Sequence, residues 1–343
     1  MFPRVNYIGN KNKIVDWIIS GIPSDVHTVI DGFAGGGSVA YSLKENGYSV
    51  IANDILYSSF VVNKALIEND EEIIDIDELG AADNYSISNK VSKRLEFLAE
   101  KLYFPSEVEE LAKLISYAEE NLTGYKYWMF LALLRRAMIR KLPYSRMNLN
   151  WENIVKLRDE QYSYAKYGRK RAYHNNSFIS HMLDALDEYN LAVFKTKSNI
   201  IVEQLDIVQL LEKYPTGDLL YLDPPYPGTM NNYDGFYGAF DLMFDKKNSH
   251  INLTSQKDFL DQMHLILKNA QNGYKYAMIS LNNSIKPSFT EFSEMISHFG
   301  KVSIFDKKHN YQVSGSDTKQ KNIELLALIE FDKNTLNKEF LTR

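Results

Sequence analysis

The chain has 343 residues, 45% of them hydrophobic, and a net charge of −5. This length is enough for about two domains or for one domain with a large insertion. It contains no cysteine, which excludes disulfides, zinc–thiolate sites, iron–sulfur clusters and enzymes that need a thiolate nucleophile. It has no run of about 18 apolar residues that would span a membrane and no apolar secretory segment at its N-terminus, so we expect a cytoplasmic protein.

The first elements of the chain form a pattern typical of a parallel sheet. Apolar residues at helical spacing predict a helix over residues 10–19. A short buried strand over 28–33, a glycine cluster, a helix over 38–46 and a second strand over 48–54 follow. Strand, glycine turn, helix and strand in this order make a βαβ unit, so we expect an α/β protein.

The sheet pattern stops after the second strand and resumes far along the chain. Residues 58–198 show helical periodicity and no persuasive buried strand. Further elements are predicted as strands over 199–203, 218–223, 274–280, 301–307 and 323–331 and as helices over 254–269 and 289–299. The last two strands are expected to be an antiparallel pair. We therefore predict an α/β domain of residues 1–57 and 199–343, interrupted by a mostly helical domain of residues 58–198.

The first strand is followed by a glycine-rich segment, DGFAGGGS from Asp31 to Ser38. Glycines at such a point permit positive φ angles and a close approach of the backbone to a ligand. Asp54 lies 17 residues after Gly37, at the end of the next strand. A carboxylate there accepts hydrogen bonds from the ribose hydroxyls of an adenosine-containing cofactor. The pattern favours a nucleotide cofactor, and the alternative is a tight structural turn.

The strand over 218–223 ends in a second motif, LDPPY from Leu222 to Tyr226. Two consecutive prolines interrupt the strand ladder and stiffen the chain. They would hold the Asp223 carboxylate, the Pro224 carbonyl and the Tyr226 ring at the carboxyl edge of the sheet, where open α/β sheets bind ligands. The alternative is a rigid turn with an incidental acid and aromatic ring.

These motifs, with the segment YIGNK from Tyr7 to Lys11, resemble the S-adenosylmethionine-dependent DNA adenine-N6 methyltransferases. Their order along the chain is the alpha order of Dam-like and type II modification enzymes. The resemblance implies a Rossmann-like methyltransferase sheet, S-adenosylmethionine as cofactor, double-stranded DNA as substrate and the insertion as the target-recognition domain. It also implies a site-specific enzyme, which would be the modification half of a restriction–modification system.

The resemblance assigns catalysis to the second motif, Asp223, Pro224, Pro225 and Tyr226. The Asp223 carboxylate and the Pro224 carbonyl would bind the two hydrogens of the adenine amine, so that its nitrogen attacks the methyl group directly. Tyr226 would stack on the base after it has left the duplex. Asp rather than Ser as the first letter favours adenine over cytosine by family analogy.

Cofactor binding is expected from residues of several segments. These residues are Tyr7, Lys11, Asp31, Phe33, Ala34, Gly35, Gly37, Asp54, Asp206 and Asp223. Some have a structural alternative. Asp206 is either near the cofactor's adenine or at a helix N-terminus, Asp31 either holds the cofactor's amino group or caps the turn, and Phe33 is either a cleft or a core residue. Tyr7 and Lys11, taken alone, are typical of a protein surface.

Charge is segregated within the predicted insertion. Residues 68–120 contain 15 Asp and Glu against 5 Lys and Arg, whereas residues 126–171 contain 12 Lys and Arg against 3 Asp and Glu. Such a basic, aromatic-rich stretch suits a polyanion, or it is a solvated helix face. The expected DNA-binding residues are Arg135, Arg136, Arg140, Lys141, Arg146, Arg169, Lys170 and Arg171. Arg146, Asn148 and Asn150 are candidates for reading bases, although no recognition signature aligns.

The remaining expectations concern the loop after the second motif, metal binding, partners and alternative functions. The loop over 227–238, rich in glycine and aromatic residues, suits a flap over an extruded base, or it is a surface loop. The seven histidines lack metal-ligand spacing, so no metal is expected, and we expect a monomer with a possible partner endonuclease. An RNA or protein-amide methyltransferase is disfavoured by the 186 residues from Gly37 to Asp223. A DNA-binding relative without catalysis and an NAD-dependent oxidoreductase are the remaining alternatives.

Overall fold

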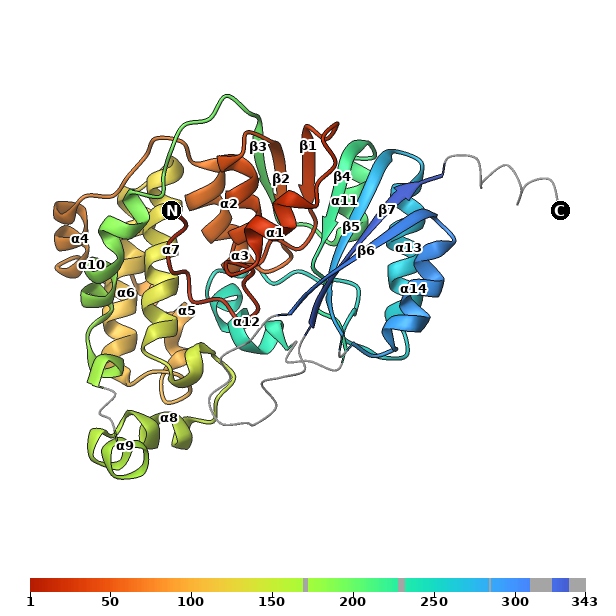
Figure 1. Cartoon of the computed structure of the whole chain (residues 1–343). Helices are drawn as coiled ribbons and strands as arrows, with labels where there is room; N and C mark the ends of the chain where they lie inside the picture. The colour runs from red at the N-terminus through yellow and green to blue at the C-terminus, as the bar shows by residue number, and fades with distance from the viewer. Residues whose placement is uncertain (169–171, 228–231, 284, 309–322, 333–343) are drawn as a thin grey trace.

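The structure is a computed structural model, and its described parts arrange seven strands in one twisted sheet (Figure 1). The described residues are 1–168, 172–227, 232–283, 285–308 and 323–332. The strands are β1 (Thr28–Asp31), β2 (Ser49–Asn53), β3 (Ile200–Glu203), β4 (Gly217–Leu222), β5 (Tyr274–Asn282), β6 (Gly300–Lys308) and β7 (Ile323–Phe331). Each strand lies close to where the sequence predicts it, so the α/β class and the strand pattern are confirmed.

The strand order is β3-β2-β1-β4-β5-β7-β6. The first five strands are parallel, and β7 runs antiparallel to both β5 and β6. The expected antiparallel C-terminal pair is therefore confirmed. The sheet reverses its direction of growth between β1 and β4, and ligands of open α/β sheets bind beyond the carboxyl ends of the strands at such a switch point.

Alternate residues of the strands serve the two faces of the sheet, because successive side chains of a strand point to opposite sides. Val29 and Leu219 pack on one face, and Ile30 and Leu220 pack on the other. The helices outside the inserted region are α1 (Val15–Ser20), α2 (Ser38–Glu45), α11 (Ile207–Lys213), α12 (Tyr233–Met243), α13 (Phe259–Gln271) and α14 (Phe289–Ser297). Helices α11, α13 and α14 cover the second face (Figure 1).

Helix α12 was absent from the sequence-based expectations, and α11 was expected only as an alternative for Asp206. Helix α11 is short, and Asp206 caps its N-terminus. Helix α12 includes residues 233–238 of the segment expected to be a flap, so the loop prediction is wrong from Tyr233 onward. The earlier part of that segment, residues 228–231, lies outside the described residues. Aromatic residues at helical spacing, Phe236, Tyr237 and Phe240, bury one face of α12 and explain why it folds.

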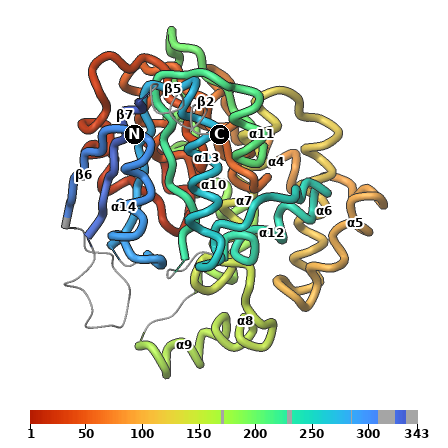
Figure 2. Tube along the Cα trace, turned by 90° about the vertical axis from the view of Figure 1, so that its right-hand side faces the viewer, coloured from red at the N-terminus to blue at the C-terminus, as the bar shows by residue number. Residues whose placement is uncertain are grey.

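The chain leaves the sheet after β2 and returns at β3, and its described part between them contains helices and turns but no strand. The helices are α3 (Tyr57–Asn63), α4 (Ile76–Asp83), α5 (Asn89–Leu95), α6 (Pro105–Asn121), α7 (Gly124–Arg140), α8 (Trp151–Arg158), α9 (Glu160–Tyr167) and α10 (Phe178–Asn190). Helices α8 and α9 lie at one end of the molecule (Figures 1 and 2).

The inserted helices share a core with the sheet. One continuous cluster of buried side chains joins Val29 and Val50 of the sheet to Leu133 of α7 and Met182 of α10. The insertion is thus packed directly on one side of the sheet, and its role as a recognition domain stays a prediction. Among the described residues, no helix is both long and apolar enough to cross a membrane.

Candidate active site at the carboxyl edge of the sheet

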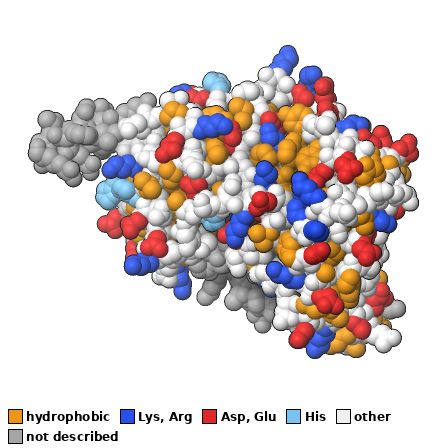
Figure 3. All heavy atoms as spheres, turned by 180° about the vertical axis from the view of Figure 1, so that it is seen from behind, with side chains coloured by type: hydrophobic (Ala, Val, Ile, Leu, Met, Phe, Trp, Pro, Cys, Tyr) orange, Lys and Arg blue, Asp and Glu red, His pale blue; other side chains and the backbone are white. Residues whose placement is uncertain are grey.

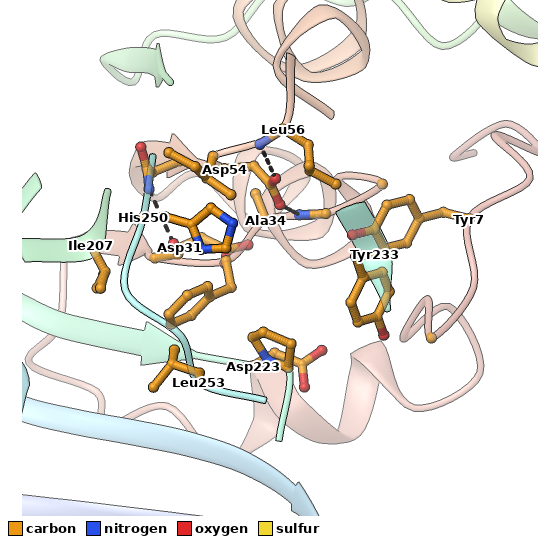
Figure 4. Close-up of a pocket in the computed structure, with 18 of the residues that line it drawn as sticks. Tyr7, Asp31, Ala34, Asp54, Leu56, Ile207, Asp223, Tyr233, His250 and Leu253 are labelled. Carbon is orange, nitrogen blue, oxygen red and sulfur yellow. Dashed lines mark hydrogen bonds between the residues drawn. The ribbon is translucent and has the colours of Figure 1, made fainter. Parts of the chain in front are cut away.

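A cavity of about 450 Å³ lies at the switch point of the sheet. Its lining comes from the segments that follow β1, β2 and β4, from the N-terminal segment and from α12. Figure 4 shows Asp31, Asp54 and Asp223 around this space, with Tyr7 and Tyr233 side by side at one end. The residues of both sequence motifs therefore meet in one place, as parallel strands that end at the same edge require.

The glycine loop is shaped by Tyr7. Gly35 and Gly37 have φ angles of +53° and +88°, a region that favours glycine. A β-carbon on Gly35 would lie 2.7 Å from the Tyr7 ring, and one on Gly36 would lie 2.8 Å from the Tyr7 Cβ. The glycines are therefore needed for backbone geometry and for the close approach of Tyr7, which places this tyrosine at the cavity rather than on an ordinary surface.

Asp54 joins the glycine loop to the end of β2. Its Oδ2 accepts a hydrogen bond from the Gly35 amide at 2.8 Å, and its Oδ1 accepts one from the Leu56 amide at 2.9 Å. Burial raises the pKa of Asp54 to about 6, and these two hydrogen bonds oppose the increase. Each oxygen keeps a further acceptor position, because a carboxylate oxygen has two lone pairs.

Asp31 is a buried carboxylate without a hydrogen-bond partner among the described residues. Its side chain is 1% exposed, and neither oxygen is bonded. Burial and the nearby Asp223 carboxylate raise its pKa well above the ordinary value, and the nearby Phe33 amide opposes this increase. Since buried polar groups are normally satisfied, two unbonded oxygens at a cavity fit a ligand that brings a positively charged donor, such as an ammonium group. This part of the cavity therefore suits a ligand that carries an ammonium group.

Asp223 is held by an ion pair from the N-terminal segment. The Lys11 ammonium lies 3.2 Å from Asp223 Oδ1 and 3.4 Å from Glu324 Oε2, on β7. Burial raises the pKa of Asp223 to about 6, Lys11 lowers it, and Glu324 raises it. Lys11 also lines the cavity, but the structure links it to the catalytic motif as well as to the expected cofactor cleft.

The other residues of the second motif differ in whether they line the cavity. Pro225 lines the cavity, and Pro224 is buried beside it. The Tyr226 side chain is 9% exposed and packs in the apolar cluster of the second sheet face, with Leu253 and Phe259. Its ring is thus occupied by core packing and is not among the cavity-lining residues, contrary to the expected open stacking face. Other aromatic residues line the cavity, among them Tyr233 of α12.

The far end of the cavity combines apolar and polar groups. Asp206 caps α11 through the Val208 amide at 2.8 Å and accepts a second bond from the Ile251 amide at 2.9 Å. Asp206 thus begins α11, as one alternative expected. It also lines the cavity, and its place near the cofactor's adenine stays a prediction. Phe33 and Ala34 line it too. His250 contacts Asp234 at 3.1 Å, and this hydrogen bond raises the pKa of His250 to about 9.

The structure corrects three of the expected DNA contacts, because these side chains are buried. Arg135 is 1% exposed and donates to the Val5 carbonyl at 2.6 Å. Arg136 donates to the Arg4 carbonyl at 2.6 Å, and Lys141 pairs with Glu107 at 2.7 Å. Phosphate contact needs an accessible cation, so Arg135, Arg136 and Lys141 have structural roles in this conformation. Arg135 also lies over the Tyr237 ring at 4.9 Å.

The other expected DNA contacts differ in exposure. Arg140 and Arg146 are partly exposed, and Asn148 and Asn150 are exposed. Arg146 lies 5.7 Å from both the Tyr144 and Phe236 rings, which docks its segment on α12 near the cavity. Arg169, Lys170 and Arg171 lie outside the described residues. On the face drawn in Figure 3, basic and acidic side chains are intermixed and form no basic stripe.

Sequence reasoning missed two residues of the site. Glu324 is a fully buried acid in an otherwise apolar strand, IELLALIEF, and this contrast was a visible signal. Tyr233 stacks on Tyr7 with ring centroids 5.7 Å apart and planes inclined by 10°. Nothing in the sequence distinguished Tyr233 from the other aromatic residues of its segment.

The comparisons with known proteins agree with this geometry. The model of the family described as D12 class N6 adenine-specific DNA methyltransferase matches residues 7–275. The chain is 40% identical to the Type II methyltransferase M2.HphI of Haemophilus parahaemolyticus over 96% of this chain and 98% of that protein. It is 23% identical to the Type II methyltransferase M.NlaIII of Neisseria lactamica over 95% and 98%, respectively. The chain therefore belongs to the D12 class of N6 adenine-specific DNA methyltransferases.

Proposed function

We propose that this adenine-N6 DNA methyltransferase is the modification enzyme of a restriction–modification system and acts on an adenine turned out of double-stranded DNA. Two relatives of matching length bear the name Type II methyltransferase, which supports the first part. The observation that carries the second is that Asp223, Asp31 and the glycine loop line one cavity. A cognate endonuclease for the same site, a monomeric state and a cytoplasmic location complete the proposal.

The cofactor roles follow from the acceptors around the cavity. S-adenosylmethionine, the methyl donor of this family, supplies an electrophilic methyl group on a positively charged sulfur. Asp31 accepts hydrogen bonds from its ammonium group, since both Asp31 oxygens lack other described partners. Asp54 binds the ribose hydroxyls with its remaining lone pairs. Asp206 and Phe33 flank the adenine ring, and Tyr7 packs against the loop that holds the amino-acid end.

Asp223 and Pro224 activate the target nitrogen. The lone pair of the adenine amine is delocalised into the ring, so the amine is a poor nucleophile. Hydrogen bonds from its two N–H groups to the Asp223 carboxylate and the Pro224 carbonyl favour a tetrahedral nitrogen whose lone pair points at the methyl group. As the C–N bond forms and the S–C bond breaks, positive charge moves to the nitrogen, where the negative carboxylate stabilises it. The surplus proton leaves through Asp223 to solvent.

The inserted helices supply target recognition in this proposal. Arg146, Asn148 and Asn150 lie on one segment that is anchored to α12 through the hydrogen bond from the Met147 amide to the Phe236 carbonyl at 2.8 Å. Helix α12 carries Tyr233 at the cavity. Arginine pairs bidentately with guanine and asparagine with adenine, so this segment is suited to reading bases next to the extruded adenine.

The proposal is tested by incubating the protein with methyl-labelled S-adenosylmethionine and plasmid DNA and digesting the product to nucleosides. We expect labelled N6-methyladenine, and single-molecule sequencing should show it in one short sequence context. Label confined to RNA, protein or cytosine would contradict the adenine assignment. Methylation of adenines without any preferred context would contradict the modification role.

A further inference from the structure

Glu324 stands out among the buried charges of the described chain. It is the second residue of β7 and is 0% exposed. It lies beyond residues 7–275, which the family model matches, and no motif of the sequence includes it. Its Oε2 is 3.4 Å from the ammonium of Lys11, which is itself 5% exposed and lies 3.2 Å from Asp223 Oδ1. Three distant segments thus form a carboxylate–ammonium–carboxylate cluster.

Stability alone is a weak reason for such a cluster. Removing charges from water costs several kcal/mol per ion, and buried ion pairs are often no more stabilising than apolar side chains of similar volume. The placement of the charges suggests a chemical reason instead. With one ammonium between two carboxylates, the net charge of the cluster is negative. Asp223, at its cavity end, is 21% exposed at the side chain, whereas Glu324 is 0% exposed.

We propose that Glu324 is a positioning residue for methyl transfer: it offsets the charge of Lys11, so that Lys11 fixes Asp223 Oδ1 in place without cancelling the negative charge that Asp223 presents to the adenine amine. This inference rests on the role proposed above for Asp223. In this arrangement Lys11 occupies one carboxylate oxygen and leaves the other to accept an N–H of the base. Without Glu324, the ammonium neutralises Asp223, and the positive charge that develops on the nitrogen is less stabilised.

The charges around Asp223 make the inference testable by pH. Within the described part of the chain, the titratable groups that face it are Lys11, Glu324, Asp31 on β1, Tyr221 on β4 and Tyr233 on α12. The pKa values of Asp31 and both tyrosines are raised, chiefly by burial, which favours their neutral forms. At saturating S-adenosylmethionine, Asp31 faces the cofactor ammonium in every variant. The variants therefore differ from the unaltered chain in the charges of Lys11 and Glu324. Because the reaction needs ionised Asp223, kcat should fall as the pH drops through about 6.

The experiment measures kcat against pH at saturating S-adenosylmethionine and DNA. Glu324→Gln removes a negative charge, so the fall of kcat at acidic pH, the acid limb of the pH profile, should move to lower pH. The plateau of kcat should fall about tenfold, which is less than the loss expected for a group that contacts the base. Lys11→Met removes a positive charge, so the acid limb should move to higher pH by roughly one unit or more. Glu330→Gln, at an exposed position of the same strand, should leave kcat and its pH profile unchanged.

Opposite shifts in the two variants support the inference, because a purely structural loss lowers kcat without moving the acid limb in opposite directions. Equal shifts, or none, would overturn it. If Glu324→Gln does not fold by circular dichroism, Glu324→Asp provides the test, since it keeps the charge. The acid limb of Glu324→Asp should match the acid limb of the unaltered chain, whereas the acid limb of Lys11→Met should not. Any other result overturns the inference. If the unaltered chain does not methylate DNA, the proposed function itself fails.

Discussion

Two regions that stand out in the sequence are built in opposite ways. At the carboxyl edge of the sheet, polar residues as distant in sequence as Lys11 and Glu324 come together. In the inserted helices, basic residues that are close in sequence turn inward to separate partners, as Arg135 does to Val5. Sheet topology fixes where a strand-end residue lies, whereas a run of charge on a helix leaves open which side chains face the solvent.

The largest effect is expected at the carboxyl edge, from Asp223→Ala. The substitution removes the acceptor that orients the amine and stabilises the charge on it, so kcat should fall by at least about 10²–10³-fold. Binding of S-adenosylmethionine, measured by equilibrium dialysis, should change little, because Asp31 and Asp54 provide the cofactor contacts. Methyl transfer that survives Asp223→Ala within a few fold would remove Asp223 from the reaction.

The next effect concerns the inserted helices. Glu107 binds Arg158 through two contacts of 2.6 and 2.9 Å and Lys141 at 2.7 Å. Glu107→Ala leaves two buried cations unpaired, so the free energy of unfolding should fall by about 3 kcal/mol. Urea unfolding measures this loss. Glu109→Ala, an exposed neighbour on α6, is the control, and an equal effect of both changes would contradict the buried role of Glu107.

A third change tests the placement of Tyr226. Because its ring packs in the apolar cluster, Tyr226→Ala should lower the free energy of unfolding by about 3 kcal/mol as well as reducing activity. Tyr226→Phe keeps the packed ring and should remain close to the unaltered chain in stability. Loss of activity in Tyr226→Ala with full stability would show instead that the ring faces the base.

The raised pKa of Asp54 predicts a smaller effect of pH, which has opposite signs for cofactor binding and for stability. The pKa of Asp54 is raised to about 6, so binding of S-adenosylmethionine should weaken as the pH falls through this value. For stability the sign reverses. The folded pKa lies above the unfolded value of about 3.9, so the contribution of Asp54 to the free energy of unfolding decreases as the pH rises from about 4 to 6. Calorimetric titration of Asp54→Asn should show a flatter pH profile of binding.

The smallest effect separates exposed from buried arginines. Arg146→Ala removes a partly exposed cation from the segment proposed to contact DNA, so the salt slope of DNA binding should fall by about one unit. Arg135→Met should leave the slope unchanged, since Arg135 is buried, but lower the melting temperature. Fluorescence anisotropy at several salt concentrations measures both. A changed slope in Arg135→Met would show that this side chain reaches DNA.

Much of the fold was predictable because local patterns and topology agree. The apolar runs that became β1, β2 and β4 are short and bounded by turn residues, and the DGFAGGGS and LDPPY motifs mark where strands end. Helix α12 was not predicted, because the glycines at positions 235 and 238 are typical of loops, whereas burial of Phe236, Tyr237 and Phe240 makes the segment helical.

The site was only partly predictable for a similar reason. Asp31, Asp54 and Asp223 follow strands, so their meeting at one edge could be derived. The partners of Lys11 could not be derived, since Glu324 lies 313 positions away and approaches only because β7 inserts between β5 and β6. The burial of Arg135 depends on tertiary packing against the N-terminal segment, and a periodic pattern in the sequence does not predict such packing.

A crystal structure of the protein with S-adenosylhomocysteine and a duplex that contains the target adenine tests the central claim most directly. The account predicts that the Asp31 carboxylate binds the amino group of the cofactor product. In the same structure, the Asp223 carboxylate and the Pro224 carbonyl should lie within hydrogen-bond distance of the adenine N6 atom. An extruded adenine held elsewhere, or a cofactor product outside the cavity at the β1 and β4 ends, would contradict it.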